Sequence, residues 1–586
     1  MRKVKTIGTF LFLTLLMSFT QDNLSAQPAI PKPTGIIKSQ DYPQNYFRNP
    51  LGITPQASGT FGELRSTHFH AGDDYRTQQK IGLPLYAVAD GYVSRIRVQA
   101  AGGGHSLYIN HPNGYTSVYL HMETFSGEMA KYVEKKQYEI QSFEIDLELN
   151  PTQFPLKKGD VIGTAGNTGS SQGPHLHFEI RDTESQNPIN TQLFGLHFKD
   201  NIPPLIQNLA IYDLLDEPFS DNTHKRIFRP TFAGSGKYKL NLSQPIKING
   251  RTGLGIQSID RHNGTSFSHG VYSIEVFLNE ENISTVVFEK LDFNTSRAVH
   301  SYVDYPTYME RNIKFQKAFK DANHPTEIYR FLKGDGSFNL EEGETAWITY
   351  RVRDIHGNTS ELAFQVKQDS TYFPDNEIIP GTKMFYFDQD NEFETEYVKV
   401  RVPKNALYDY LYFRYSMGEK PADGYSAIHH IHSPKIPLFS SYELRVKADS
   451  TLTTELHEKA LLVNARGSSI GGYFEDGYVI AKSGAFGSFH IKVDTIAPVI
   501  RPINISPNKN MRGVKSLRVQ ISDNLSGIQS YEGRINGEWV LMKYDPKTRN
   551  LWHEFSPNLG SGNHVFELVV KDNKNNTKTY QVKFVR

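Results

Sequence analysis

The strongest constraint on the fold is a pattern of short apolar runs interrupted by glycine and other turn residues. Between residues 51 and 182, such runs occur at 85–89, 91–98, 106–110 and 161–165. Runs of this length with turn signals between them indicate antiparallel β-strands. The 36 Phe and 32 Tyr residues greatly outnumber the 3 Trp residues, which suits strand-rich modules with modest cores. We therefore expect a mainly β protein.

Two later segments of the chain begin and end alike. One opens with Asp200-Asn-Ile-Pro-Pro-Leu-Ile and the other with Asp494-Thr-Ile-Ala-Pro-Val-Ile, and each closes with a strand, a turn and a strand. The closing pattern V-x-D-x-x-x-N-T resembles that of bacterial immunoglobulin-like β-sandwiches. We therefore expect such sandwiches over residues 200–368 and 494–586.

The full length of 586 residues fits about four domains of roughly 150 residues each. The 200–368 segment is too long for one sandwich and must carry an insertion, in which residues 306–322 are expected to be helical. Residues 369–493 are strand-rich but lack a clear signature, and a third sandwich is one interpretation.

The N-terminus indicates export. Basic residues at positions 2, 3 and 5 precede an apolar run at 7–19, and Leu24-Ser-Ala26 offers small residues for cleavage. This is typical of a signal peptide over 1–26, although an uncleaved anchor is the alternative. A proline-rich, extended lead-in follows at 27–50. We expect a mature protein without an integral membrane segment, located in the periplasm, outside the cell or on its surface.

Composition excludes several function classes. A net charge of +1 provides no basic field for nucleic acid, so no nucleic-acid partner is expected. The chain has no cysteine, which excludes disulfides, cysteine nucleophiles and thiolate zinc sites. Any metal ion must therefore be held by histidine and carboxylate side chains.

Three short motifs in the first domain place histidine and aspartate at strand spacing. In His70-Ala-Gly-Asp-Asp74, residues 70 and 74 share a face if the segment is extended. In His175-Leu-His177, both histidines share a face while Leu176 faces the core. By the same spacing, Tyr119 and His121 are expected to share a face. Alone, H-x-G-x-D is weak evidence, because a surface histidine with a turn aspartate explains it better. H-x-H alone is moderate evidence, and Y-x-H alone is a common strand end.

Together the motifs H-x-G-x-D, Y-x-H and G-P-H-L-H-F-E are specific. Over residues 50–182, within an expected domain at 51–190, they resemble the lysostaphin/LytM-type zinc metallopeptidases, which cleave peptidoglycan peptides. The resemblance implies an antiparallel β-sheet metallopeptidase domain followed by the sandwich modules. It also implies a peptide-bond hydrolase that acts on peptidoglycan stems or cross-links.

The resemblance assigns roles to five residues. It implies that His70, Asp74 and His177 bind one zinc ion per chain and that His121 and His175 are the catalytic pair beside it. Three protein ligands leave the open fourth position that a catalytic zinc needs. Which of the two catalytic histidines acts as general base stays open.

Two non-enzymatic functions compete with this interpretation. Degenerate relatives bind murein or activate an amidase, but they usually lack one of the five groups that this chain retains. In an adhesion or scaffold protein, the sandwich modules would matter most and would provide surfaces for protein partners.

Several features depart from the family pattern or suggest other sites. Asp73 replaces a usual apolar residue and is expected to lie beside the metal or to face solvent. The long link from His121 to Lys157 is expected to add a hairpin at the rim of the cleft. His68 is a weaker candidate ligand. The pattern His429-His-Ile-His432 is expected to form a surface loop rather than a metal site. Residues 467–471 are not expected to form a serine-hydrolase elbow, because no helix follows them.

Overall fold

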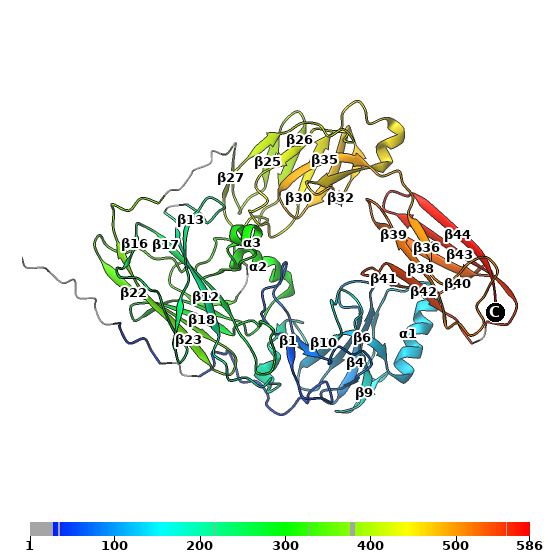
Figure 1. Cartoon of the computed structure of the whole chain (residues 1–586), viewed down its shortest axis with the longest axis horizontal. Coiled ribbons are helices and arrows are strands. Elements are labelled where there is room, and N and C mark those ends of the chain that lie inside the picture. Colours follow the sequence, from blue (N-terminus) through cyan, green and yellow to red (C-terminus); the bar gives the residue numbers. More distant parts are fainter. Residues whose placement is uncertain are drawn as a thin grey trace, which may run out of the picture.

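The computed structural model describes residues 27–32, 35–215, 217–325, 327–374, 381, 383–557 and 559–586. Over these residues, four β-rich units follow one another around a ring (Figure 1). The expected signal peptide at 1–26 lies outside the described residues. Among the described residues, no helix combines the length and apolar character needed to cross a membrane.

The first unit is an 11-stranded sheet with one long helix. Its central strand order is β1-β2-β10-β6-β5-β4-β7, and the paired strands are antiparallel. The elements are β1 Ala57–Gly59, β2 Asp73–Arg76, β3 Pro84–Tyr86, β4 Gly91–Val98, β5 His105–Asn110, β6 Tyr115–Phe125, α1 Gly127–Ile140, β7 Ile145–Glu148, β8 Pro155–Leu156, β9 Val161–Ala165, β10 His175–Asp182, β11 Pro188–Ile189 and the 3-10 helix η1 Thr191–Phe194.

Strand periodicity sets the two faces of this sheet. On β10, Leu176, Phe178 and Ile180 have no exposed surface, and they pack into the core of the unit. The alternating His177 and Glu179 therefore leave the opposite face. The same strand thus anchors the fold on one side and presents polar groups on the other.

The link between His121 and Lys157 forms a helix and an edge strand, so the expected hairpin at the cleft rim is wrong. Helix α1 follows β6 and buries Met129, Val133 and Gln137, which recur every fourth residue along one face. Strand β7 then pairs with β4 at the far end of the sheet order from β2. The alternation that suggested a hairpin belongs to this edge strand.

The second unit contains a four-stranded and an eight-stranded sheet around a shared core. Its strands are β12 Leu205–Asp213, β13 His224–Phe228, β14 Thr231–Gly234, β15 Lys237–Lys239, β16 Ile246–Ile248, β17 Thr252–Ile259, β18 Ser273–Leu278, β19 Glu281–Val287, β20 Gln316–Lys317, β21 Tyr329–Leu332, β22 Thr345–Arg353 and β23 Thr359–Gln368.

The insertion in the second unit is only partly helical. Its helices are η2 Phe293–Ala298, α2 Val299–Tyr302 and α3 Tyr305–Arg311. Asp304 caps α3 by accepting a hydrogen bond from Thr307 N, and Asn312 ends it in a left-handed conformation. Phe315 and Phe319 are buried beyond the helix, around the short strand β20, so the expected helix to residue 322 is too long.

The third unit packs two five-stranded sheets on one core. Its elements are β24 Lys383–Phe385, β25 Asn391–Glu394, β26 Val398–Val402, β27 Leu411–Phe413, β28 Tyr415–Met417, β29 His429–Ile431, β30 Tyr442–Lys447, η3 Thr454–Lys459, β31 Ala460–Asn464, β32 Ser469–Gly471, β33 Tyr473–Glu475, β34 Tyr478–Ser483 and β35 Gly487–Val493.

The fourth unit packs a four-stranded sheet on a five-stranded sheet. Its strands are β36 Val499–Pro502, β37 Lys509–Asn510, β38 Ser516–Ser522, β39 Ile528–Ile535, β40 Glu538–Val540, β41 Lys543–Asp545, β42 Asn550–Glu554, β43 Asn563–Asp572 and β44 Thr577–Val585. The unit returns to α1 of the first unit (Figure 1). There, the rings of Tyr138 and Trp539 meet edge to face, with their centroids 5.3 Å apart.

Candidate metal centre and active site

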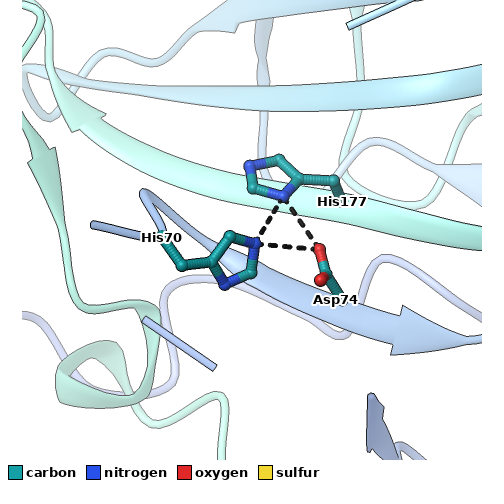
Figure 2. Close-up of side chains that lie close together, drawn as sticks. All are labelled: His70, Asp74 and His177. Atoms are coloured by element: carbon teal, nitrogen blue, oxygen red, sulfur yellow. Dashed lines mark hydrogen bonds and ion pairs between the residues drawn. The ribbon is translucent and has the colours of Figure 1, made fainter. Parts of the chain in front are cut away.

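Three side chains suited to metal binding meet between strands β2 and β10. His70 lies three residues before β2, Asp74 lies within β2, and His177 lies within β10. Asp74 is directly opposite His177 in the antiparallel register, so both side chains leave the same face. Asp74 Oδ1 is 2.9 Å from His177 Nδ1 and 3.0 Å from His70 Nε2, and these two nitrogens are 3.0 Å apart (Figure 2).

The far nitrogen of each of these histidines is fixed by a hydrogen bond. His70 Nδ1 donates to the carbonyl of Thr60 at 2.8 Å, and His177 Nε2 donates to Glu179 Oε1 at 2.9 Å. Because each ring donates through its far nitrogen, the lone pairs of His70 Nε2 and His177 Nδ1 face Asp74. Metal-ligating histidines are commonly oriented by such outer partners.

The charges around Asp74 favour a bound cation. Arg65 Nη2 holds the outer oxygen of Asp74 at 2.9 Å. Burial alone would raise the pKa of Asp74, but the neighbouring histidines, His70 first, hold it well below its ordinary value. Burial likewise lowers the pKa of His177, but hydrogen bonds to Asp74 and Glu179 outweigh it and raise this pKa to about 9. The position between these groups therefore attracts positive charge, as a proton or as a metal ion.

The donor set fits a divalent metal ion. Two imidazole nitrogens and one carboxylate oxygen are ligands that zinc and related metals accept. Ligand atoms about 2.0–2.2 Å from a tetrahedral ion lie about 3.3 Å from one another. The separations of 2.9–3.0 Å are close to this value. Three such ligands leave one coordination position for water or substrate.

Two further histidines flank the three groups. The rings of His121 and His175 lie 4.9 Å apart, and His175 Nε2 is 3.5 Å from Asp74 Oδ1. His121 Nδ1 donates to the carbonyl of Thr168 at 2.9 Å, and His175 Nδ1 donates to that of Gly173 at 2.8 Å. Burial, followed by the neighbouring His175, lowers the pKa of His121 to about 3. Its Nε2 is therefore a free base at neutral pH.

A bulge in β6 turns His121 toward this site. The register between β5 and β6 shifts between His105 and Leu107, and His121 has a φ of 62°. Tyr119 instead has no exposed surface and packs its ring 5.2 Å from Phe178 in the core. The expectation that Tyr119 and His121 share a face is therefore wrong, because the bulge breaks the strand's alternation.

Close packing explains the glycine of the first motif. A Cβ atom on Gly72 would lie 2.3 Å from the carbonyl oxygen of Phe178 and 2.9 Å from His177 Nε2. A larger residue would push β10 away from the segment that carries His70 and Asp74. The glycine thus permits the two segments to approach closely enough for their side chains to converge.

Comparison with known proteins agrees with this geometry. Residues 68–138 and 148–191 match Peptidase family M23. The chain contains an M23 peptidase domain. The DD-carboxypeptidase/endopeptidase Mpg of Neisseria meningitidis is 31% identical over 131 residues, which cover 22% of this chain and 24% of Mpg.

A second relative and a solved structure are also similar to part of the chain. The peptidoglycan DD-endopeptidase ShyC of Vibrio cholerae is 32% identical over 188 residues, covering 31% of this chain and 35% of ShyC. The chain thus matches about a quarter to a third of the length of these relatives. A crystal structure of the M23 catalytic domain of EnpA from Enterococcus faecalis is 23% identical, covering 26% of this chain and 97% of that domain. Its TM-score of 0.19 is too low to support a conclusion.

The two unusual residues of the M23 domain lie apart from the metal-binding groups. Asp73 is fully buried and accepts hydrogen bonds from Phe61 N and Thr191 Oγ1, so the expectation that it lies beside the metal or faces solvent is wrong. It joins η1 to the segment before β2. His68 is exposed and contacts Thr67, and the group of converging ligand atoms does not include it.

Sequence reasoning missed the outer partners of the M23 site. Glu179 was readable in principle, because it lies two residues after His177 and shares its strand face. Arg65 and the carbonyl groups of Thr60 and Thr168 carried no such signal, because loops bring them to the site.

The patterns outside the M23 domain give no catalytic site. His429 lies in β29 and is buried against Tyr415 Oη, so the expected surface loop is wrong there. Residues 467–471 lead into strands β32 and β33 without a helix, as expected for a sequence that is not a hydrolase elbow. Residues 382–494, which contain both patterns, match a Zu5-like domain.

The fourth unit contacts the loop that holds the flanking histidines. Lys547 Nζ donates to the carbonyl of Asn167 at 2.5 Å and to that of Ser171 at 3.2 Å. The carbonyl of Thr168 holds His121, and the Ser171 hydroxyl lies 3.1 Å from His175 Nδ1. A residue almost four hundred positions downstream thus braces the M23 site.

Proposed function

We propose that this protein is an exported zinc metalloendopeptidase that hydrolyses D,D peptide cross-links in peptidoglycan. The observation that carries the proposal is the convergence of His70, Asp74 and His177 beside a second pair of histidines. The names of the relatives Mpg and ShyC, both DD-endopeptidases, support the bond type and the cell-wall substrate. The basic and apolar N-terminus supports export to the periplasm or cell surface.

In this proposal, His70 Nε2, Asp74 Oδ1 and His177 Nδ1 hold the zinc ion. When bound, zinc supplies a Lewis acid and lowers the pKa of a coordinated water to about 7. Glu179 and the Thr60 carbonyl keep the two histidine rings oriented, so that binding needs little rearrangement. Arg65 keeps the Asp74 carboxylate in place from its outer side.

The second histidine pair moves the protons. Each ring donates through Nδ1 to a backbone carbonyl, which leaves Nε2 of His121 and His175 able to accept a proton. One of them accepts the proton of the attacking water, and the other stabilises the developing oxyanion or protonates the leaving amine. Either histidine can take either role, because the two rings lie side by side.

The test is product analysis on purified sacculi. Residues 27–586 loaded with zinc are incubated with sacculi and with isolated cross-linked muropeptide dimers, and the products are identified by mass spectrometry. We expect dimers to become monomers with a new amino and a new carboxyl terminus at the D,D bond. The matched control is His177→Ala, which removes a ligand from the same strand face.

Three outcomes separate the alternatives. Absence of new termini from a folded, zinc-loaded chain would overturn the endopeptidase proposal. Binding to sacculi without cleavage would instead favour a murein-binding or amidase-activating protein. Cleavage at another stem bond would retain the hydrolase and reject the D,D specificity.

A further inference from the structure

A second cluster of acidic and histidine side chains lies where the first unit meets the second. Asp200 lies in the linker before β12, and Asp260 and His262 follow β17. One ligand atom of each lies within 4.8 Å of the others. Asp354 directly follows β22. Burial raises its pKa, and the nearby carboxylates of Asp260 and Asp200 raise it further.

Three buried polar atoms of this cluster lack partners. Asp260 is 1% exposed and His262 is 3% exposed. Asp260 Oδ1, Asp200 Oδ2 and His262 Nδ1 are buried and have no hydrogen-bond partner. Buried polar atoms in native proteins are nearly always satisfied, by protein, water or an ion. The unsatisfied atoms here include two carboxylate oxygens and one ring nitrogen, which are metal ligands by type.

The cluster also lacks a balancing cation. Among the described residues, no lysine or arginine forms an ion pair with Asp200, Asp260 or Asp354, and the nearest recorded pair is His262 Nε2 with Asp260 Oδ2 at 3.5 Å. Burial lowers the pKa of His262, which opposes a charge on this ring. Buried carboxylates without a partner are costly, so groups like these take up either a proton or a bound cation.

The fourth unit provides an internal comparison. Its Asp494, Asp523 and Asp572 correspond in sequence position to Asp200, Asp260 and Asp354 of the second unit. These three aspartates also converge. Asp572 accepts hydrogen bonds from backbone N–H groups two and four residues on and from the Asn576 side chain, and Asp354 does the same with Asn358.

The two clusters differ in their source of positive charge. Burial lowers the pKa of Lys574, and the nearby carboxylates of Asp494 and Asp572 oppose this effect. The residue that corresponds to Lys574 in the second unit is His356, whose pKa is lowered by burial. The fourth unit therefore has a lysine beside its carboxylates at the position where the second unit has a histidine.

We propose that Asp200, Asp260 and His262, with Asp354 beside them, form a second divalent-cation site. Two carboxylate oxygens and one imidazole nitrogen suit zinc or manganese better than calcium, which prefers oxygen alone.

The position gives this site a structural role. His262 stacks on Phe198 of the linker, with ring centroids 5.6 Å apart, and on His269 at 4.1 Å. His269 Nδ1 lies 3.5 Å from Glu63 Oε1, and Glu63 also binds Arg65, which holds Asp74. A cation here braces the joint between the M23 domain and the second unit.

The experiment measures bound metal in a chain whose catalytic ligands are removed. The parent is the full chain with His70→Ala and His177→Ala, stripped with a chelator and reloaded with zinc, manganese or calcium. After desalting, bound metal is determined by mass spectrometry. We expect about one zinc or manganese ion per chain, and at least a tenfold loss of affinity when Asp260→Asn is added.

The matched control in the same parent is Asp335→Asn. Asp335 lies in the same unit but pairs with Arg251, outside the cluster. It is expected to retain the metal, and circular dichroism checks that both variants remain folded. If Asp260→Asn does not fold, His262→Gln provides the second test, with the same expected loss.

The proposal is overturned if the parent retains none of the three metals or if its metal survives both Asp260→Asn and His262→Gln. Binding of calcium alone would also overturn it, because His262 would then not be a ligand. Because the catalytic ligands are absent from the parent, these results are independent of the proposed hydrolysis.

Discussion

The proposed catalytic centre and the cluster of Asp200, Asp260 and His262 at the junction of the first two units (the junction cluster) use the same side-chain types in different settings. In the centre, the ligand atoms of His70, Asp74 and His177 lie within 3.0 Å of one another, and each ligand has an outer partner. In the junction cluster, His262 Nε2 lies 3.5 Å from Asp260 Oδ2, and Asp260 and His262 each have an unpartnered atom. Preformed geometry with a flanking histidine pair suits catalysis, whereas a closed cluster without that pair suits a structural ion.

The largest effect is expected from His177→Ala. Removing this ligand takes away the Lewis acid, which contributes several kcal/mol, so cross-link hydrolysis falls by about 10³-fold or more. Asp260→Asn, which leaves the catalytic ligands intact, is expected to retain at least about ten times more activity than His177→Ala. Muropeptide release by the two variants, measured with their zinc content, checks this. Equal losses in both would contradict the division between the two sites.

Outer partners give the next largest effect. Glu179→Ala removes the acceptor that orients His177, and such changes weaken metal binding or activity by about 10–100-fold. Glu179→Gln keeps an acceptor oxygen but loses the charge, and it is expected to fall between the wild type and Glu179→Ala. Competition with a chelator measures zinc affinity directly. A loss of stability with unchanged zinc affinity would assign Glu179 a purely structural role.

The motifs predicted the strand-borne part of this centre. Period-two spacing placed His175 and His177 on one face and Leu176 in the core, and the structure has this arrangement. The same rule failed for His121, because a bulge with a positive φ interrupts β6. Bulges depend on how neighbouring strands pair, which local sequence does not encode.

The junction cluster shows another limit of sequence reasoning. The repeated opening and closing motifs predicted two related sandwiches, but they did not show which cluster of aspartates has a lysine close by. That difference rests on one position, His356 or Lys574, and on the burial of its neighbours. The contact from Lys547 to the M23 loop was equally hidden, because it depends on how distant units are arranged.

The two sites are also expected to differ in pH dependence. Burial, followed by the neighbouring Asp200, raises the pKa of Asp260 from 3.8 to about 8. The folded metal-free chain therefore binds more protons than the unfolded chain between these values, and its stability falls as pH rises through this window. Asp260→Asn is expected to remove part of that fall, on the order of 2 kcal/mol.

Urea unfolding with chelator at pH 5 and pH 7.5 measures this difference. Asp335→Asn serves as the control, since its pKa is lowered and it contributes no fall in this window. Adding zinc at pH 7.5 is expected to stabilise the wild type more than Asp260→Asn. A parallel pH dependence in wild type and Asp260→Asn would contradict an uncompensated charge at the junction.

The smallest effect is expected where the fourth unit contacts the catalytic loop. Lys547→Ala removes two hydrogen bonds that hold residues 167–171, and these residues orient both flanking histidines. If losing these hydrogen bonds raises the activation free energy by about 1 kcal/mol, kcat falls about fivefold, and the zinc content is expected to stay unchanged. The exposed Lys578→Ala in the same unit controls for charge. An increase in kcat for Lys547→Ala alone would mean that this contact restrains the enzyme, and the fourth unit would then be inhibitory rather than supporting.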